Sequence, residues 1–339
     1  MLTLLATLAA AVLVSLAVRR YYQGPVFKSD KRLDGKTVFV TGANTGIGLI
    51  TAKDLYRRGG RVVIFCRNKD KAEAAAESVR AEVRAENPGD KPGELLVEVM
   101  DLSSLASVRA AAKRVLDRES RLDLLILNAG VMMAPAEPRT ADGFDMQMGT
   151  NHLGHFLFTR LLAPLLKDTA AKTGDVRVVT LSSTAHIFTK VPLRLHDLNW
   201  ARRDEFTPLE AYAQSKLANI HFSRELGVRM AGTGVSTSAV HPGVVATELN
   251  RYCAESSNLV ARLFHVIFYK VLGFFIKTPW HGTQTTLYCA LSDEMKGVSG
   301  KFYSDSAEMT PSDSALMKEN DAKLWDLSDK LTGCEGMAI

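Results

Sequence analysis

Short apolar runs rich in β-branched residues recur along the chain and alternate with longer stretches rich in Ala and charged residues. The longer stretches, such as residues 69–86 and 105–119, have the periodicity of helices. A short seventh run lies near residues 301–303, after six clear ones at 37–41, 61–66, 95–100, 123–127, 176–181 and 235–240. Apolar strands separated by helices form a parallel sheet covered on both faces. We therefore predict an α/β fold with a doubly wound parallel sheet of about seven strands, whose ligands bind beyond the carboxyl ends of the strands.

The composition fits an enzyme-sized domain and excludes several other classes of protein. Of the 339 residues, 46% are hydrophobic and 23% are charged, which excludes a disordered chain, a collagen-like repeat and a small disulfide-rich protein. The net charge of +5 is spread along the chain, so nucleic-acid binding is not expected. The four cysteines lack metal-ligand spacing, which predicts reduced thiols and no metal site: Cys66, Cys253, Cys289 and Cys334.

The first 18 residues, MLTLLATLAAAVLVSLAV, carry no charge. As a helix they would span about 27 Å, close to the hydrocarbon thickness of a bilayer. Arg19 and Arg20 follow, which by the positive-inside rule place the rest of the chain on the cytoplasmic side, and Tyr21 and Tyr22 are of a residue type that favours the membrane interface. The pattern predicts a membrane anchor, with a cleaved presequence or a core helix as the alternatives. We divide the chain into four segments: an anchor (residues 1–18), a linker (19–36), a main domain (37–305) and a C-terminal helix with a tail (306–339).

A glycine-rich turn, TGANTGIG, follows the first predicted strand and leads into a helix. Glycines allow a tight turn whose backbone amides approach a pyrophosphate, and the helix N-terminus adds unpaired N–H groups. The spacing differs from GxGxxG and from the phosphate-binding loop GxxxxGK. The turn predicts a dinucleotide site built by Gly42, Asn44, Gly46, Ile47 and Gly48.

Arg67 stands directly after the second predicted strand, where it discriminates between the two nicotinamide dinucleotides. A carboxylate there would bind the ribose hydroxyls of NAD, whereas an arginine receives the 2′-phosphate of NADP. A solvated basic turn is the alternative, because Lys69 and Lys71 follow. We predict NADP(H), with further contacts at the same sheet edge from Asp101, Leu102, Asn128, Ala129 and Gly130.

Tyr212 and Lys216 form the sequence YAQSK in a stretch with a helical pattern. Residues four apart share one helix face, so the ammonium group is expected beside the phenol, where it lowers the tyrosine pKa. A tyrosine tuned in this way serves as a proton donor or acceptor for a carbonyl. An ordinary surface pair is the alternative, but Asn151 and the pair Ser182–Ser183 follow neighbouring predicted strands.

Together these motifs resemble the short-chain dehydrogenase/reductase family, which has a Rossmann-like fold. The matching segments occur in the family's order from about residue 36 to 305: TGANTGIG, NAG at 128–130, NHLGHF, the serine pair, YAQSK and HPG at 241–243. Within that family, DGFDMQMGTNHLGHF, LSSTAH, DLNW and HPGVVATEL are similar to the membrane-anchored retinol dehydrogenase branch. Two departures are Leu127, where the family often has an asparagine, and a long gap between Ser183 and Tyr212.

The resemblance implies a role for each matching residue. Tyr212 would be the catalytic acid/base, Lys216 would lower its pKa and hold the nicotinamide ribose, and Asn151 would complete a proton relay. Ser183 would orient the substrate, with Ser182 left open. The cofactor would be bound by the glycine turn and the sheet-edge residues above, by Tyr212 and Lys216, and by Pro242, Val244 and Thr247.

The expected function is interconversion of a lipophilic aldehyde and its alcohol, retinal and retinol, with NADP(H). Reduction of other lipid or steroid carbonyls and an NADP-sensing scaffold are the alternatives. The expected location is the endoplasmic reticulum membrane with the catalytic domain facing the cytosol, and a mitochondrial membrane is the alternative. The sequence does not decide between a monomer and a homo-oligomer. Residues 258–276 are predicted as a lid, an interfacial helix or a packed helix, and His152, His155 and His186 as packing or capping groups.

Overall fold

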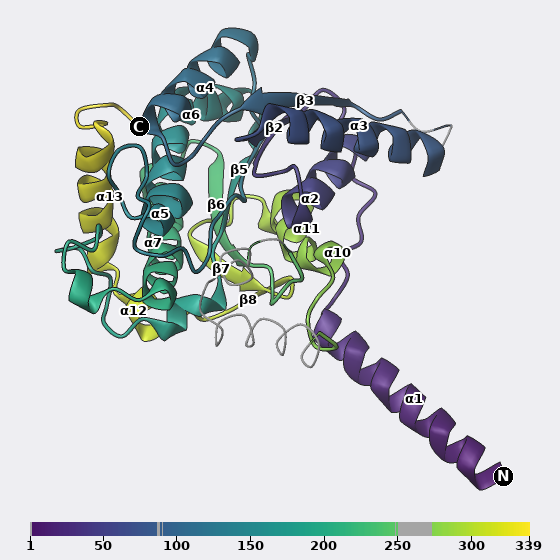
Figure 1. Cartoon of the computed structure of the whole chain (residues 1–339). Helices are drawn as coiled ribbons and strands as arrows, with labels where there is room; N and C mark the ends of the chain where they lie inside the picture. The colour runs from purple at the N-terminus through teal and green to yellow at the C-terminus, as the bar shows by residue number, and fades with distance from the viewer. Residues whose placement is uncertain (1, 87–88, 90, 248, 250–272) are drawn as a thin grey trace.

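The computed structural model describes residues 2–86, 89, 91–247, 249 and 273–339, with the backbone alone for residues 2–12. Eight strands form one sheet in the order β3-β2-β1-β4-β5-β6-β7-β8 (Figure 1). All neighbours are parallel except β7 and β8, which are antiparallel. The strands are β1 (Thr37–Thr41), β2 (Arg61–Cys66), β3 (Glu94–Val99), β4 (Leu124–Leu127), β5 (Val176–Leu181), β6 (Val235–His241), β7 (Lys301–Ser304) and β8 (Ala307–Glu308). The predicted doubly wound parallel sheet is confirmed, and the two-residue β8 is an addition to it.

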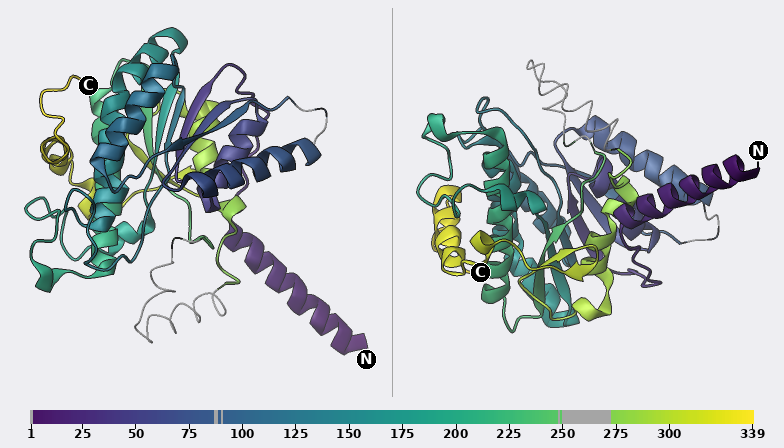
Figure 2. Two further views of the ribbon diagram at one scale, coloured as in Figure 1. Left: turned by 45° about the horizontal axis from the view of Figure 1, so that its top comes forward. Right: turned by 90° about the horizontal axis from the view of Figure 1, so that it is seen from below.

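Helices connect the strands and cover both faces of the sheet (Figure 2). The long ones are α1 (Leu2–Gln23), α2 (Gly46–Arg57), α3 (Lys69–Glu86), α4 (Leu105–Arg118), α6 (Gly154–Thr173), α7 (Pro208–Arg229), α11 (Gln284–Leu291) and α13 (Glu319–Thr332). The short ones are α5 (Met146–Met148), α10 (Pro279–Gly282), α12 (Asp313–Leu316), the π-helix η1 (Gly149–Leu153), and the 3₁₀ turns η2 (Thr184–Phe188), η3 (Arg203–Glu205) and η5 (Asp293–Met295).

Two hydrophobic cores lie on opposite faces of the sheet because successive strand residues point to opposite sides. Phe39 and Phe65 belong to the core that α4, α6 and α7 cover, and Trp325 of α13 packs onto the same side. Val40 and Ile64 belong to the other core, which α2, α3 and α11 cover. Each strand is therefore buried on both faces, which explains the continuous apolar runs in the sequence.

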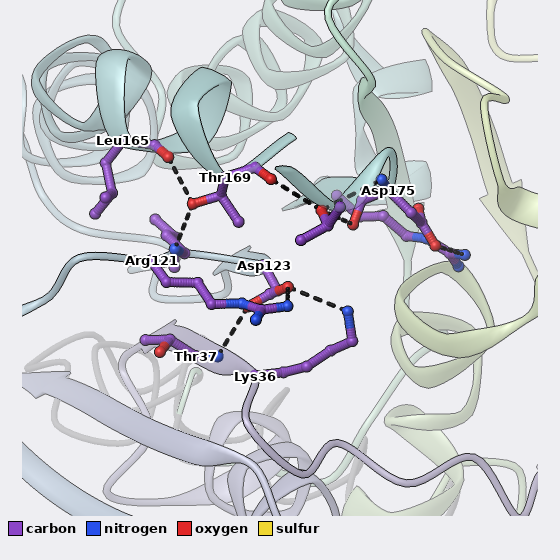
Figure 3. Close-up of polar contacts among 10 residues, drawn as sticks. Lys36, Thr37, Arg121, Asp123, Leu165, Thr169 and Asp175 are labelled. Atoms are coloured by element: carbon purple, nitrogen blue, oxygen red, sulfur yellow. Dashed lines mark hydrogen bonds and ion pairs between the residues drawn. The ribbon is translucent and has the colours of Figure 1, made fainter. Parts of the chain in front are cut away.

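A polar network closes the amino ends of the central strands, at the edge of the sheet away from the predicted site (Figure 3). The buried Asp123 accepts the Thr37 N–H at 3.0 Å, and it pairs with Lys36 at 3.2 Å and Arg121 at 2.6 Å. Beside it, Thr169 accepts the Leu122 N–H at 2.9 Å. These contacts provide hydrogen-bond partners for backbone groups at the amino ends of the strands. The predicted ligand site lies at the opposite, carboxyl edge of the sheet.

The N-terminal helix α1 projects away from the body of the protein (Figure 1). It runs five residues into the predicted linker and ends at Gln23. Leu13, Val14 and Leu16 are exposed on it. Over the part of the chain that the structure describes, no helix is long and apolar enough to cross a membrane. The predicted segment 258–276 lies outside the described residues except for its last four.

The C-terminal segment 306–339 packs against the main domain. β8 pairs with β7 across the predicted boundary at residue 305. Trp325 of α13 stacks on Phe222 of α7 with ring centroids 6.0 Å apart, and Arg160 of α6 binds Asp329 at 2.8 Å. The segment therefore completes the core over α6 and α7.

Candidate active site

The glycine turn connects β1 to α2 at the carboxyl edge of the sheet. Gly42 and Gly46 have φ angles of +64° and +59°, a region that other residues rarely adopt. A Cβ added to Gly42 would lie 2.8 Å from Ala129, and one on Gly48 would lie 2.4 Å from the Asn128 amide nitrogen. The absence of side chains thus lets the turn approach the segment after β4. A close backbone turn at the N-terminus of a 12-residue helix fits the pyrophosphate of a dinucleotide.

Asn128 holds the glycine turn in place. Its side-chain amide donates to the carbonyl oxygens of Thr41 at 2.8 Å and Gly42 at 3.1 Å. On the other side, burial raises the pKa of the Cys66 thiol to about 11, and backbone hydrogen bonds from Ala43 and Asn44 oppose that rise. The turn is therefore fastened to the ends of two strands, β2 and β4. The family resemblance implies that Asn128 lies along the cofactor, and the structure shows that its amide braces the glycine turn.

The residues predicted to bind the adenosine end follow β2 and β3 at the same edge. Arg67 is exposed immediately after β2. Asp101 accepts hydrogen bonds from the N–H and hydroxyl groups of Ser103 at 2.9 and 2.7 Å, and Leu102 is buried. Asp101 is thus bonded to its own turn, and Arg67 presents an exposed guanidinium group, the kind of group that binds phosphate through charge-assisted hydrogen bonds.

Tyr212 and Lys216 lie one turn apart on α7, and both side chains are buried. Thr207 caps the helix by accepting the Glu210 N–H. The Lys216 ammonium group donates to the Leu181 carbonyl at 3.1 Å and lies 5.6 Å from the centroid of the Tyr212 ring. The predicted juxtaposition of phenol and ammonium is therefore present.

The predicted direction of the tyrosine shift is wrong in this structure. Burial raises the pKa of Tyr212 to about 12, and a hydrogen bond with Ser183 only partly opposes that rise. Burial also lowers the pKa of Lys216 to about 8. The ammonium group is directed to a backbone carbonyl, so loss of hydration outweighs its attraction for the phenolate. At neutral pH the phenol keeps its proton, which is the form that a proton donor requires.

The two serines after β5 have different partners. The Ser182 hydroxyl is buried and donates to the Lys216 carbonyl at 2.7 Å, so it fastens α7 to the sheet. The Ser183 hydroxyl accepts the Ala185 N–H at 3.1 Å, and its side chain lowers the pKa of Tyr212. Geometry therefore favours Ser183 for orienting a substrate oxygen.

Asn151 lies in the π-helix η1, between α5 and α6. Its side chain accepts the Val131 N–H at 2.8 Å and donates to the Val131 carbonyl and the Ser215 hydroxyl, both at 2.9 Å. It thereby ties the segment after β4 to α7, next to Lys216. A Cβ on Gly130 would lie 3.3 Å from Asn151 and 3.5 Å from the Lys216 ammonium, so these three residues converge.

The segment after β6 lies against the glycine turn. A Cβ added to Gly46 would lie 3.2 Å from the Thr247 methyl group, while Val244 is exposed. Val245 forms an isolated parallel bridge with Lys277. This segment, which includes Pro242, therefore lies between the glycine turn and Lys277.

Several residues that build the site had no distinct signal in the sequence. Thr41 accepts the N–H groups of Asn128 and Ala129, and Ser215 receives Asn151. His155 bonds to Thr41 and Asn151, as the predicted packing role allows. No group of three or more His, Cys, Asp or Glu side chains suited to a metal ion occurs among the described residues.

A tight glycine turn and a buried Tyr–Lys pair with Ser183 nearby, at one edge of a doubly wound sheet, define a nicotinamide-dependent dehydrogenase of the short-chain type. The family profile described as short chain dehydrogenase matches residues 36–193. The chain belongs to this family, in the branch that contains the retinol dehydrogenases, and is an NAD(P)-dependent oxidoreductase.

Relatives with similar sequences cover nearly the whole chain. Retinol dehydrogenase 12 of Homo sapiens is 43% identical over 321 residues, which are 95% of this chain and 94% of that protein. Retinol dehydrogenase 13 of Homo sapiens is 39% identical over 339 residues, which are 100% of this chain and 96% of that protein. A crystal structure of an uncharacterized protein from Mycobacterium paratuberculosis has a TM-score of 0.67 and 34% identity, and the match covers 91% of this chain and 98% of that one.

Proposed function

We propose that this protein is an NADP(H)-dependent reductase of lipophilic aldehydes, with retinal as substrate and retinol as product. The single observation that carries the proposal is the pair of buried side chains Tyr212 and Lys216 on α7, with the ammonium group 5.6 Å from the centroid of the phenol ring. The relatives named retinol dehydrogenase support the choice of substrate. NADP(H) is proposed because Arg67 offers an exposed cation at the end of β2.

In the proposed reaction the bound nicotinamide supplies a hydride to the carbonyl carbon. Ser183 donates a hydrogen bond to the carbonyl oxygen, and Tyr212 transfers its phenolic proton to that oxygen as the alcohol forms. Lys216 holds the nicotinamide ribose and supplies positive charge beside the phenolate that remains. Asn151 fixes the position of the segment after β4 relative to α7 through its hydrogen bonds to Val131 and Ser215.

The proposed cofactor contacts follow the edge of the sheet from the adenosine end to the nicotinamide end. Asp101 and Leu102 flank the adenine, and the glycine turn binds the pyrophosphate through backbone amides. The nicotinamide end lies near Asn128, Ala129 and Gly130, with Pro242, Val244 and Thr247 opposite.

We also propose that α1 attaches the protein to the endoplasmic reticulum membrane with the catalytic domain in the cytosol. The exposed Leu13, Val14 and Leu16 on a helix that projects from the body support this attachment. Cell fractionation with markers for the endoplasmic reticulum and for mitochondria tests this location. Recovery of the protein in a mitochondrial membrane would contradict the assignment.

The experiment for the proposed activity incubates purified full-length protein in detergent micelles with retinal and either NADPH or NADH. Formation of retinol with NADPH is the expected result. A panel of steroid ketones and other lipid aldehydes runs beside it, with the variant Tyr212→Phe as the matched control. Faster reduction of a steroid ketone than of retinal would contradict retinal as the substrate. Absence of turnover with every carbonyl compound in the panel would contradict the proposed reductase activity.

A further inference from the structure

The last residue of α1 forms two hydrogen bonds with a segment more than 250 positions away in the sequence. Gln23 is 6% exposed. Its side-chain amide donates to the Ile276 carbonyl at 3.1 Å, and its amide oxygen accepts the Thr278 N–H at 3.0 Å. The side chain therefore pairs with residues 276–278 as the edge of a neighbouring strand would.

The opposite edge of residues 276–278 pairs with the segment after β6. The Lys277 N–H donates to the Val244 carbonyl at 2.8 Å, and the Ala246 N–H donates to the Lys277 carbonyl at 3.0 Å. In an extended strand, neighbouring residues direct their backbone groups to opposite edges. Gln23 occupies one edge of this strand, and residues 244–246 occupy the other.

Residues 244–247 in turn contact the cofactor loop. A Cβ added to Gly46 would lie 3.2 Å from the Thr247 methyl group. A Cβ added to Gly282 would lie 2.7 Å from the Val245 side chain and 3.3 Å from the Ile47 side chain, so these three residues lie close together. The segment is thus held between the glycine turn and residues 276–278, and its position depends on both.

Further contacts fasten the same junction. The Lys277 side chain passes over Gly243 and forms an ion pair with Asp305. Arg19 donates to the Phe274 carbonyl at 3.3 Å, and the rings of Tyr22 and Phe275 meet edge to face at 4.8 Å. The end of α1 is therefore a packed part of the catalytic domain.

From this chain of contacts we infer that Gln23 is a positioning residue for residues 244–247, and that it sets the affinity of the site for the nicotinamide end of the cofactor and for the carbonyl substrate. The inference rests on the proposed function for the identity of both ligands. It also means that the orientation of α1 acts on the active site through residues 274–278, which Gln23, Arg19 and Tyr22 connect to the helix.

The first test measures hydrogen–deuterium exchange of the full-length protein without cofactor. Gln23→Met preserves the length of the side chain and removes both hydrogen bonds. We expect exchange in peptides that cover Ala246 and Lys277 to accelerate by about fivefold or more, since two hydrogen bonds are lost. Arg20→Met is the matched control, because Arg20 is exposed on the same helical turn. Equal exchange in both variants and in the unsubstituted protein would overturn the inference.

The second test measures the dissociation constant for NADPH by fluorescence and the KM for the aldehyde. For Gln23→Met both should rise by about threefold to tenfold, with a smaller change in kcat, whereas Arg20→Met should leave them unchanged. Gln23→Glu, which keeps the acceptor for Thr278 and loses the donor for Ile276, should fall between. A lower melting temperature with unchanged binding constants would show a merely structural role and overturn the inference. Failure of the unsubstituted protein to reduce any aldehyde would instead overturn the proposed function, while the exchange result would still decide whether Gln23 fastens residues 244–247.

Discussion

The hydroxyl oxygen of Thr41 lies 2.8 Å from Nε2 of His155. The same oxygen already accepts the N–H groups of Asn128 at 2.9 Å and Ala129 at 3.0 Å. The hydroxyl proton is therefore donated to Nε2, which leaves the ring proton on Nδ1, and Nδ1 donates to the Asn151 carbonyl at 3.0 Å. A neutral His155 thus connects the end of β1 to the π-helix that carries Asn151.

The first prediction concerns this connection. His155→Leu removes both hydrogen bonds at similar volume, so Asn151 loses the partner that holds its backbone. We expect kcat to fall by about tenfold, because small displacements of catalytic groups reduce turnover strongly. Thr159→Val is the control, since it removes a hydrogen bond to the His155 carbonyl on the same helix. Equal kcat in the two variants would show that His155 contributes to stability alone.

Three of the buried histidines have strongly lowered pKa values, which predicts a loss of stability in acid. Burial lowers the pKa of His152 to about 3, and of His155 and His241 to about 4. In the unfolded chain these rings take up protons near pH 6.5, so their contribution is complete above that pH and is lost as the pH falls towards 4. Each ring should reduce the free energy of unfolding by about 1.4 kcal/mol per pH unit within this window.

Urea unfolding between pH 7.5 and 4.5 measures this slope. His152→Gln should reduce the slope by about 1.4 kcal/mol per pH unit, because the contribution of one buried ring is removed. The control is His196→Gln, at an exposed position that leaves the buried histidines in place. A slope in the unsubstituted protein that does not increase below pH 6.5 would contradict the prediction.

Replacement of the proposed acid should separate binding from chemistry. Tyr212→Phe removes only the hydroxyl group, so the dissociation constant for NADPH should stay nearly unchanged. Turnover should fall by about 10² to 10⁴-fold, the usual contribution of general acid catalysis. Stopped-flow measurement of NADPH oxidation with retinal checks this, and kcat near that of the unsubstituted protein would show that another group donates the proton.

The sheet and the edge that carries the site could be predicted from the sequence because both depend on local patterns. A strand that is buried on both faces must be apolar throughout, as Val38 and Ile64 illustrate, so the strands are visible in the sequence. The parallel order then places Gly42, Arg67 and Asn128 at one edge, whatever the details of packing.

Long-range packing could not be predicted in the same way. The sequence RRYYQ after the apolar run has the composition of a polar linker, whereas Gln23 is buried because residues 276–278 lie beside it. The pKa of Tyr212 was predicted to fall because Lys216 is four residues away. The four-residue spacing of Tyr212 and Lys216 does not show how far the phenol is buried from water, and this burial is the main cause of the raised pKa of Tyr212.

Removal of residues 1–18 should release the protein from membranes and leave the catalytic domain folded. The deletion ends before Arg19, so the contacts of Arg19, Tyr22 and Gln23 with residues 274–278 are kept. Carbonate extraction and urea unfolding of the truncated protein measure both properties. Persistent membrane attachment would assign the anchoring role to another segment, of which residues 258–276 are the first candidate.

The last prediction concerns the choice of cofactor. Arg67→Asp removes the proposed cation for the 2′-phosphate and places a carboxylate against it, while offering NADH a partner for its ribose hydroxyls. The ratio of kcat/KM for NADPH to that for NADH should therefore fall by at least about 100-fold, since repulsion is added to the lost attraction. Lys113→Asp makes the same change of charge at an exposed position on α4 and should leave the ratio unaltered. Measurement of both ratios with one aldehyde decides the matter: an unsubstituted protein that prefers NADH, or an Arg67→Asp variant with an unchanged ratio, would refute the assignment of NADP(H).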